Sequence, residues 1–332
     1  MSASEGSEPS AVAGRPGRLR LVLSTLGAVV VTGVCLRLLL TRETLRALGD
    51  VLPRVDPLVL GLVLPLVVGV TLVRAARFSL LLGVRGPGAT ASLLRVCALQ
   101  AFLNLMLPFK VGEASFPVLA RRSFGTPYGT GIGALLYVRV TDLLLLIAIG
   151  GGVLSAIGRG SSPLERFALP AALTALVLLS LLPALVTRVH ALGRTVIGSP
   201  RMLELLDRLG DGCRAVATPR RHAAYVALSV CAWALIATCA CVTMGAMGAM
   251  GARPNVLHAM LACAGASLTF ALPVSGVAGV GPMQASWAYA LTLVGWGWEL
   301  ALANAFLYHA TMVACSAVLA LVASAMRVRR VA

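Results

Sequence analysis

Charged residues are scarce in this chain. Asp, Glu, Lys and Arg together make up 12% of the 332 residues, whereas hydrophobic residues make up 58%. Soluble domains carry about 25% charged residues, so the composition excludes an ordinary soluble protein. Apolar segments take up nearly the whole length and leave no room for a sizeable soluble domain. We therefore predict an all-α polytopic membrane protein, because helices satisfy their own backbone groups in lipid.

Motifs for catalysis and for bound cofactors are missing as well. The sequence contains no His-Glu-x-x-His element, no Ser-His-acid set and no paired carboxylate motif. It has no G-x-G-x-x-G or Walker pattern, so a nucleotide site is not expected. Its eight cysteines form neither a Cys-x-x-Cys pair nor a His/Cys cluster, which predicts no metal site. We expect no cofactor and no enzymatic activity.

The positive charge of the chain lies mostly in short loops. The net charge of +16 comes from arginines between apolar runs, a placement typical of membrane topology signals rather than of nucleic-acid binding. Residues 41–56 carry as many acidic as basic side chains, which predicts an external loop. The arginine-rich loop 188–221 is predicted to be cytoplasmic. Arg74 and Arg77 are assigned to another cytoplasmic loop, after a span that ends at residue 73.

The chain divides into one transmembrane domain and two tails. Residues 1–20 are predicted to be a disordered cytoplasmic tail, 21–326 the transmembrane domain, and 327–332 a basic cytoplasmic tail. Both termini are therefore expected inside, with the protein in the cell membrane. Six spans of about 17 to 28 residues match a hydrocarbon core of about 30 Å. They are residues 21–40, 57–73, 132–157, 167–186, 223–250 and 300–325.

The first of two interrupted apolar segments lies around Pro108. Proline removes a backbone donor, and Gly112 lets the chain leave helical geometry. Residues 96–109 are too few for an ordinary span, and basic residues flank them on both sides. We therefore predict a re-entrant hairpin that enters from the cytoplasm and returns through residues 112–120.

The second interrupted segment has no charged residue between Pro254 and Trp298. A break at residues 274–281 divides it into two apolar arms. These arms are either two full spans, which would give eight spans in total, or a second hairpin that enters from outside. In the second case the halves 57–157 and 223–325 would be inverted repeats, as in many transporters.

Polar groups near the two breaks are the candidate site. Lys110 and Glu113 form either an interfacial pair at a helix start or the polar mouth of a cavity. Arg139 and Asp142 are three residues apart on one helical face. We expect them to form a salt bridge with each other or to contact a headgroup or a proton. The turn after Pro273 either presents backbone N–H groups to an anion or joins two packed helices. Its polar and glycine members are Ser275, Gly276, Gly279 and Gly281.

These residues together resemble the flippase-like integral membrane family typified by the transmembrane region of lysylphosphatidylglycerol synthase. The family pattern is an asparagine, Pro-x-x-x-Gly-Glu, a basic pair and Arg-x-x-Asp. Its counterparts here are Asn104, Pro108, Gly112, Glu113, Arg121, Arg122, Arg139 and Asp142. Near the C-terminus the family shows a proline, a glycine-rich turn and a glutamate. The counterparts of these are Pro273, Gly276, Gly279, Gly281 and Gln284, so a neutral side chain replaces the glutamate. The resemblance covers about residues 70–325.

The resemblance implies a lipid translocase, or a lipid-binding protein, whose site is formed by those residues. The implied partner is a membrane lipid, anionic or lipid-linked, with a lipid-modifying enzyme or glycosyltransferase as a second partner. Two alternatives stay open: a membrane-embedded enzyme or accessory subunit of a glycolipid-synthesising complex, and a structural scaffold. Aminoacyl transfer is not implied, because these 332 residues do not include the soluble synthase domain. Without a built-in ATPase, translocation would use facilitated exchange or an ion gradient.

Overall fold

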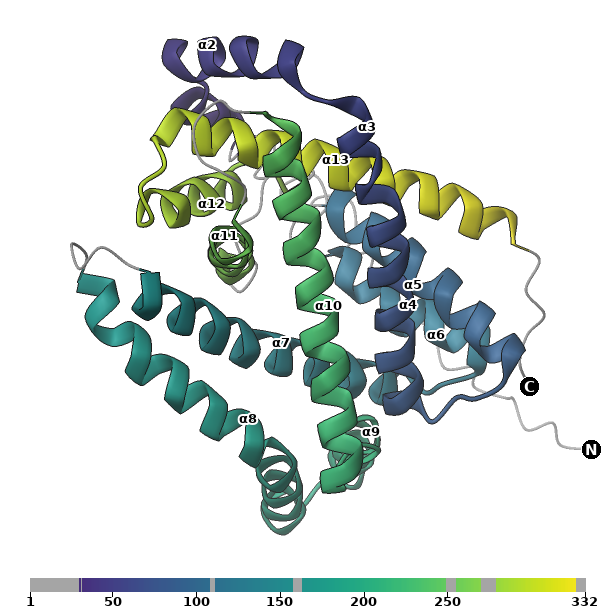
Figure 1. Ribbon diagram of the computed structural model, residues 1–332. Helices are drawn as coiled ribbons and strands as arrows, with labels where there is room; N and C mark the ends of the chain where they lie inside the picture. The colour runs from purple at the N-terminus through teal and green to yellow at the C-terminus, as the bar shows by residue number, and fades with distance from the viewer. Residues whose placement is uncertain are drawn as a thin grey trace, which may run out of the picture.

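The described part of the chain is helical. The computed structural model describes residues 30, 32–107, 111–157, 163–248, 255–269 and 279–326. These ranges contain no strand, which confirms the predicted all-α class. Among them, six helical segments are long and apolar enough to cross a membrane. They are α3 (Pro57–Gly61) joined to α4 (Val63–Leu82), α5 (Pro87–Met106), α7 (Tyr128–Ile157), α8 (Pro163–Val196), α10 (Pro219–Ala246) and α13 (Trp298–Ala325) (Figure 1).

Five of the six predicted spans coincide with these helices. The predicted span 21–40 lies mostly outside the described residues, and its residues 32–39 are helical. The sixth membrane-length helix is α5, which the sequence placed in a shorter hairpin. The division into inverted halves stays a prediction.

The first hairpin is longer than predicted. α5 begins at Pro87, nine residues before the expected start, so Arg95 lies within the helix rather than ahead of it. A single arginine is a poor boundary signal, because its long side chain can carry the charge away from apolar surroundings. After the break, α6 (Val111–Phe124) packs back against α5. The two helices approach each other closely at Gly112, where a Cβ atom would overlap the backbone of Asn104.

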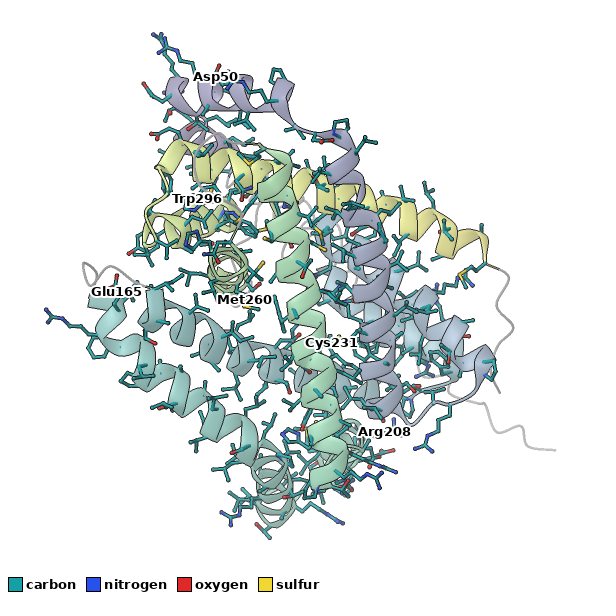
Figure 2. The ribbon with its side chains drawn as sticks, viewed as in Figure 1. Asp50, Glu165, Arg208, Cys231, Met260 and Trp296 are labelled. Atoms are coloured by element: carbon teal, nitrogen blue, oxygen red, sulfur yellow. The ribbon has the colours of Figure 1, made fainter. Side chains whose placement is uncertain are left out.

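The second interrupted segment forms two short helices. α11 (Val256–Thr269) has 14 residues and α12 (Pro282–Thr292) has 11. At 1.5 Å per residue these helices are about 21 Å and 17 Å long, and neither reaches across a core of about 30 Å. They pack against each other, and Trp296, at the turn after α12 (Figure 2), donates from Nε1 to His258 Nδ1 of α11 at 3.2 Å. This geometry favours the hairpin over two full spans.

Two helices shorter than a span lie at opposite ends of the bundle. α2 (Arg42–Val51), followed by the single turn η1 (Leu52–Arg54), crosses the end formed by α10 and α13 (Figure 1). α9 (Pro200–Arg214) lies at the other end and approaches α7 so closely that a Cβ atom on Gly133 would overlap the backbone of α9. Asp50 of α2 and Arg208 of α9 mark these two ends in Figure 2. The predicted external and cytoplasmic loops are therefore on different sides of the bundle, and which side faces the cytoplasm stays a prediction.

Buried side chains form two large clusters. One includes Trp287 of α12, which is fully buried, together with residues of α10, α11 and α13. The other includes Phe78 of α4, Phe116 of α6, and Tyr137 and Tyr225 of α7 and α10. On α7, the charged groups described below lie between Val138 of the second cluster and Val153 of the first.

Candidate functional site

Arg77 and Asp142 form an enclosed ion pair between α4 and α7. Arg77 Nη2 lies 2.6 Å from Asp142 Oδ1, and the two side chains are 4% and 13% exposed. Arg77 also donates to the Tyr225 hydroxyl at 3.0 Å, and Trp233 Nε1 donates to Asp142 Oδ1 at 3.3 Å. A buried charge is tolerated when it is paired and hydrogen-bonded. Two aromatic side chains of α10 therefore hydrogen-bond to this pair, while Arg77 Nε has no partner among the described residues.

Arg139 and Glu113 form a second ion pair, between α7 and α6. Arg139 Nη2 lies 2.9 Å from Glu113 Oε1, and its Nε donates to Glu113 Oε2 at 3.0 Å. Both carboxylate oxygens are therefore bound by one guanidinium in the two-point geometry that arginine favours. Arg139 is 39% exposed and Glu113 16%, so this pair is far more open than the first.

The expected salt bridge between Arg139 and Asp142 is absent from the described residues. The two side chains do lie on one side of α7, as their spacing requires, but each is paired with a residue of another helix. Glu113 on α6 meets two nitrogens of Arg139 through both carboxylate oxygens, the bidentate geometry that suits a planar guanidinium. The alternative that these two residues pair with each other is therefore wrong, and contact with a headgroup or a proton stays a prediction.

A third arginine, Arg74, stands one turn before Arg77 on α4. The predicted end of this span at residue 73 is wrong, because α4 continues to Leu82 and places both arginines inside the helix. Arg74 is half-buried and makes no ion pair with a described residue. In the described part of the chain, three guanidinium groups, those of Arg74, Arg77 and Arg139, therefore accompany only two carboxylates here. The cluster carries an excess of positive charge.

The charged cluster borders a cavity of about 340 Å³, a volume typical of small-molecule sites. Both hairpins contribute to its wall: Asn104 and Glu113 from the first, Ser267 and Met283 from the second. A smaller hollow of about 50 Å³ adjoins it. Four residues line both spaces, namely Arg74, Asn104, Arg139 and Asp142.

The wall of the larger cavity changes from charged to apolar. Along α4 the lining runs from Val67 to Arg74, and along α7 it runs from Asp142 to Leu146. The remaining wall is mainly hydrophobic and aromatic, with Trp287 and Tyr308 stacked at 4.4 Å between ring centroids. A cavity with one charged and one apolar part suits an amphipathic molecule.

Other predicted residues lie away from this cavity. Arg121 and Arg122 are exposed in the last turn of α6, and the Arg121 guanidinium lies 4.5 Å from the Tyr128 ring centroid. Gly112 serves the contact between α5 and α6 and is not part of the wall. The remaining predicted residues in the two breaks lie outside the described residues. They are Pro108, Lys110, Pro273, Ser275 and Gly276.

The glycine-rich turn of the second hairpin leads into the N-terminus of α12, which is buried. Gly281 has a φ of 124°, a value that favours glycine, and its N–H donates to Gln284 Oε1 at 2.7 Å. Gln284 is fully buried and does not line the cavity. Gly279, two residues before Gly281, has a φ of 70° and lies close to the His309 ring. The side chain that stands in place of the family's glutamate therefore caps α12.

The sequence interpretation missed Arg74, Arg77 and Trp233 as site residues. A signal for the two arginines was available, because the apolar run resumes after them in residues 78–82. Nothing local indicated Trp233, whose partner Asp142 is 91 residues away. No group of three or more His, Cys, Asp or Glu side chains in the described ranges could hold a metal ion.

Comparison with known families places most of the chain in one of them. Residues 24–320 match the family described as "Lysylphosphatidylglycerol synthase TM region". No curated protein and no solved structure matches the chain. The family match includes both hairpins, both ion pairs and all the residues that line the cavity.

Proposed function

The chain belongs to the lysylphosphatidylglycerol synthase TM region family, and we propose that it is a lipid translocase that passes a polar headgroup through the cavity. Family membership ties this multi-pass membrane protein to lipid handling. The observation that carries the finer proposal is the cavity itself, which is built from both hairpins and has charged and apolar parts.

The two ion pairs are suited to different roles. The Arg77–Asp142 pair is enclosed, and its carboxylate oxygen Oδ1 also accepts from Trp233, so it holds helices together. Arg139 is 39% exposed and lines the cavity, so a headgroup that enters can contact it. Exchange of Glu113 for a lipid phosphate on this guanidinium would keep Arg139 paired while the headgroup is bound, and the phosphate would meet the same two-point geometry.

Purified protein in liposomes tests the proposal. We expect it to accelerate movement of tail-labelled lipid between leaflets and to leave the lipid chemically unchanged. Empty liposomes, and liposomes that contain heat-denatured protein, are the controls. A covalent change in the lipid would instead support a membrane-embedded enzyme. Wild-type protein that accelerates no lipid would contradict translocation.

A further inference from the structure

The position of Arg74 bears on which lipid the cavity accepts. Arg74 lines both the large cavity and the adjoining hollow, one turn from Arg77 on α4. Its guanidinium carries a full positive charge at every physiological pH. Among the described residues it has no ion-pair partner.

The two carboxylates nearby are already committed. Both oxygens of Glu113 accept from Arg139. Asp142 accepts from Arg77 through both oxygens, at 2.6 Å and 3.5 Å, and from Trp233. In this structure each carboxylate is therefore paired with another arginine, and neither forms an ion pair with Arg74.

A guanidinium in a poorly hydrated wall favours an anion, because an unpaired charge away from water is costly. Arginine matches a phosphate particularly well, since two of its N–H groups can donate to two phosphate oxygens. Asn104 lines the same two spaces and supplies a neutral amide that can donate to the same group.

We propose that the cavity selects a lipid whose headgroup is a net-negative phosphate ester, with the phosphate bound by Arg74 where the large cavity meets the smaller hollow. The apolar wall formed by Val67, Val70, Leu143 and Leu146 then receives the glycerol and the start of the acyl chains. A zwitterionic headgroup is disfavoured, because its cation would meet the positive excess of the cluster without a free carboxylate. The inference rests on the proposed function and specifies its substrate class.

Exchange assays with two probes test the charge preference. Phosphatidylcholine liposomes would carry either tail-labelled phosphatidylglycerol, which is anionic, or tail-labelled phosphatidylcholine, which is zwitterionic. We expect wild-type protein to move the anionic probe at least about tenfold faster, as loss of a charged hydrogen bond implies. Arg74→Gln should remove this preference, Arg74→Lys should keep part of it, and Arg188→Gln, an exposed arginine on α8, should leave it unchanged.

A binding measurement keeps the inference testable without transport. In detergent, short-chain phosphatidylglycerol should raise the melting temperature of the wild type but not that of Arg74→Gln. Glycerol 3-phosphate without acyl chains should raise it less, and an equal effect would indicate a site for soluble phosphate esters instead of a lipid.

The two proposals fail in different ways. If wild type moves both probes equally, or if well-folded Arg74→Gln keeps the preference, the headgroup class is wrong and the translocase stands. If no probe moves but the anionic lipid stabilises only proteins with Arg74 or Lys at that position, translocation is wrong and the headgroup class stands. Should Arg74→Gln fail to fold, the test uses wild type and Arg74→Lys. A wild-type preference for the anionic probe that Arg74→Lys keeps only in part supports the proposal, and equal movement of both probes by wild type overturns it.

Discussion

Arg77 of α4 and Asp142 of α7 face each other across 65 residues of sequence, with 2.6 Å between Nη2 and Oδ1. Tyr225 and Trp233 of α10 add one hydrogen bond to each member of the pair. Three membrane-length helices, α4, α7 and α10, therefore meet at this ion pair. Because the pair is enclosed, loss of either member would leave the other charged and unpaired.

The first prediction concerns this pair. Asp142→Asn should lower the free energy of unfolding in detergent by about 3–5 kcal/mol, because it leaves Arg77 buried and uncompensated. Adding Arg77→Gln should recover part of the loss. Asp211→Asn is the matched control, since its partner Arg214 is also 2.6 Å away but the pair is exposed, and it should cost about 0–1 kcal/mol. Equal losses for Asp142→Asn and Asp211→Asn would show that the enclosed pair is not a structural unit.

The second prediction concerns Glu113. We expect Glu113→Gln to leave the melting temperature within a few degrees of wild type, because Arg139 keeps access to the cavity. It should nevertheless slow lipid exchange strongly. In the proposed cycle the Glu113 carboxylate takes the place of the departing headgroup on Arg139, and a neutral glutamine cannot do so. Glu204→Gln, which removes the carboxylate of the exposed Arg208 pair, is the control and should exchange lipid normally. Normal exchange by Glu113→Gln would refute the role proposed for this pair.

The third prediction concerns Gln284. Because this side chain is fully buried at the start of α12, Gln284→Glu should lower the melting temperature and the yield of folded protein by burying a charge. Gln284→Met keeps the volume and loses only the hydrogen bond to Gly281, so it should cost about 1 kcal/mol. A Glu variant as stable as wild type would mean that water reaches this turn.

The fourth prediction concerns the contact between α5 and α6. A methyl group at Gly112 has no room beside Asn104, so Gly112→Ala should separate the two helices and cost about 1–3 kcal/mol. Because Glu113 is the next residue, lipid exchange should fall as well. Gly88→Ala, where a Cβ atom has open space, is the control. Similar behaviour of the two variants would argue against close packing at Gly112.

The fifth prediction concerns orientation. Native Cys213 is a poor probe of α9, because burial raises the pKa of its thiol to about 11, well above the usual value, although nearby Arg214 lowers it. Thiolate is the reactive form, so Cys213 should label slowly near neutral pH and faster as the pH rises toward 11. In a background without native cysteines, Asp50→Cys should react with an impermeant maleimide added to intact cells, and Arg201→Cys should not. The reverse pattern would invert the topology.

The membrane class and most of the helices could be predicted from the sequence. Long apolar runs, the arginine distribution and the Pro/Gly breaks are local signals, and they located five of the membrane-length helices. They also identified Asn104, Glu113, Arg139 and Asp142, which do line one cavity. The lengths of α11 and α12 were needed to favour the hairpin over two spans, because the uncharged stretch contains no topology signal.

Which charges pair was decided only by the tertiary structure. Spacing along α7 placed Arg139 and Asp142 on one side, but their partners come from residues 26 and 65 positions away. Arg77 was assigned to a loop because counting arginines near the end of a span cannot detect a carboxylate on another helix. Helical periodicity reports which side chains share a face. It does not report what that face meets, because the contact depends on how separate helices pack.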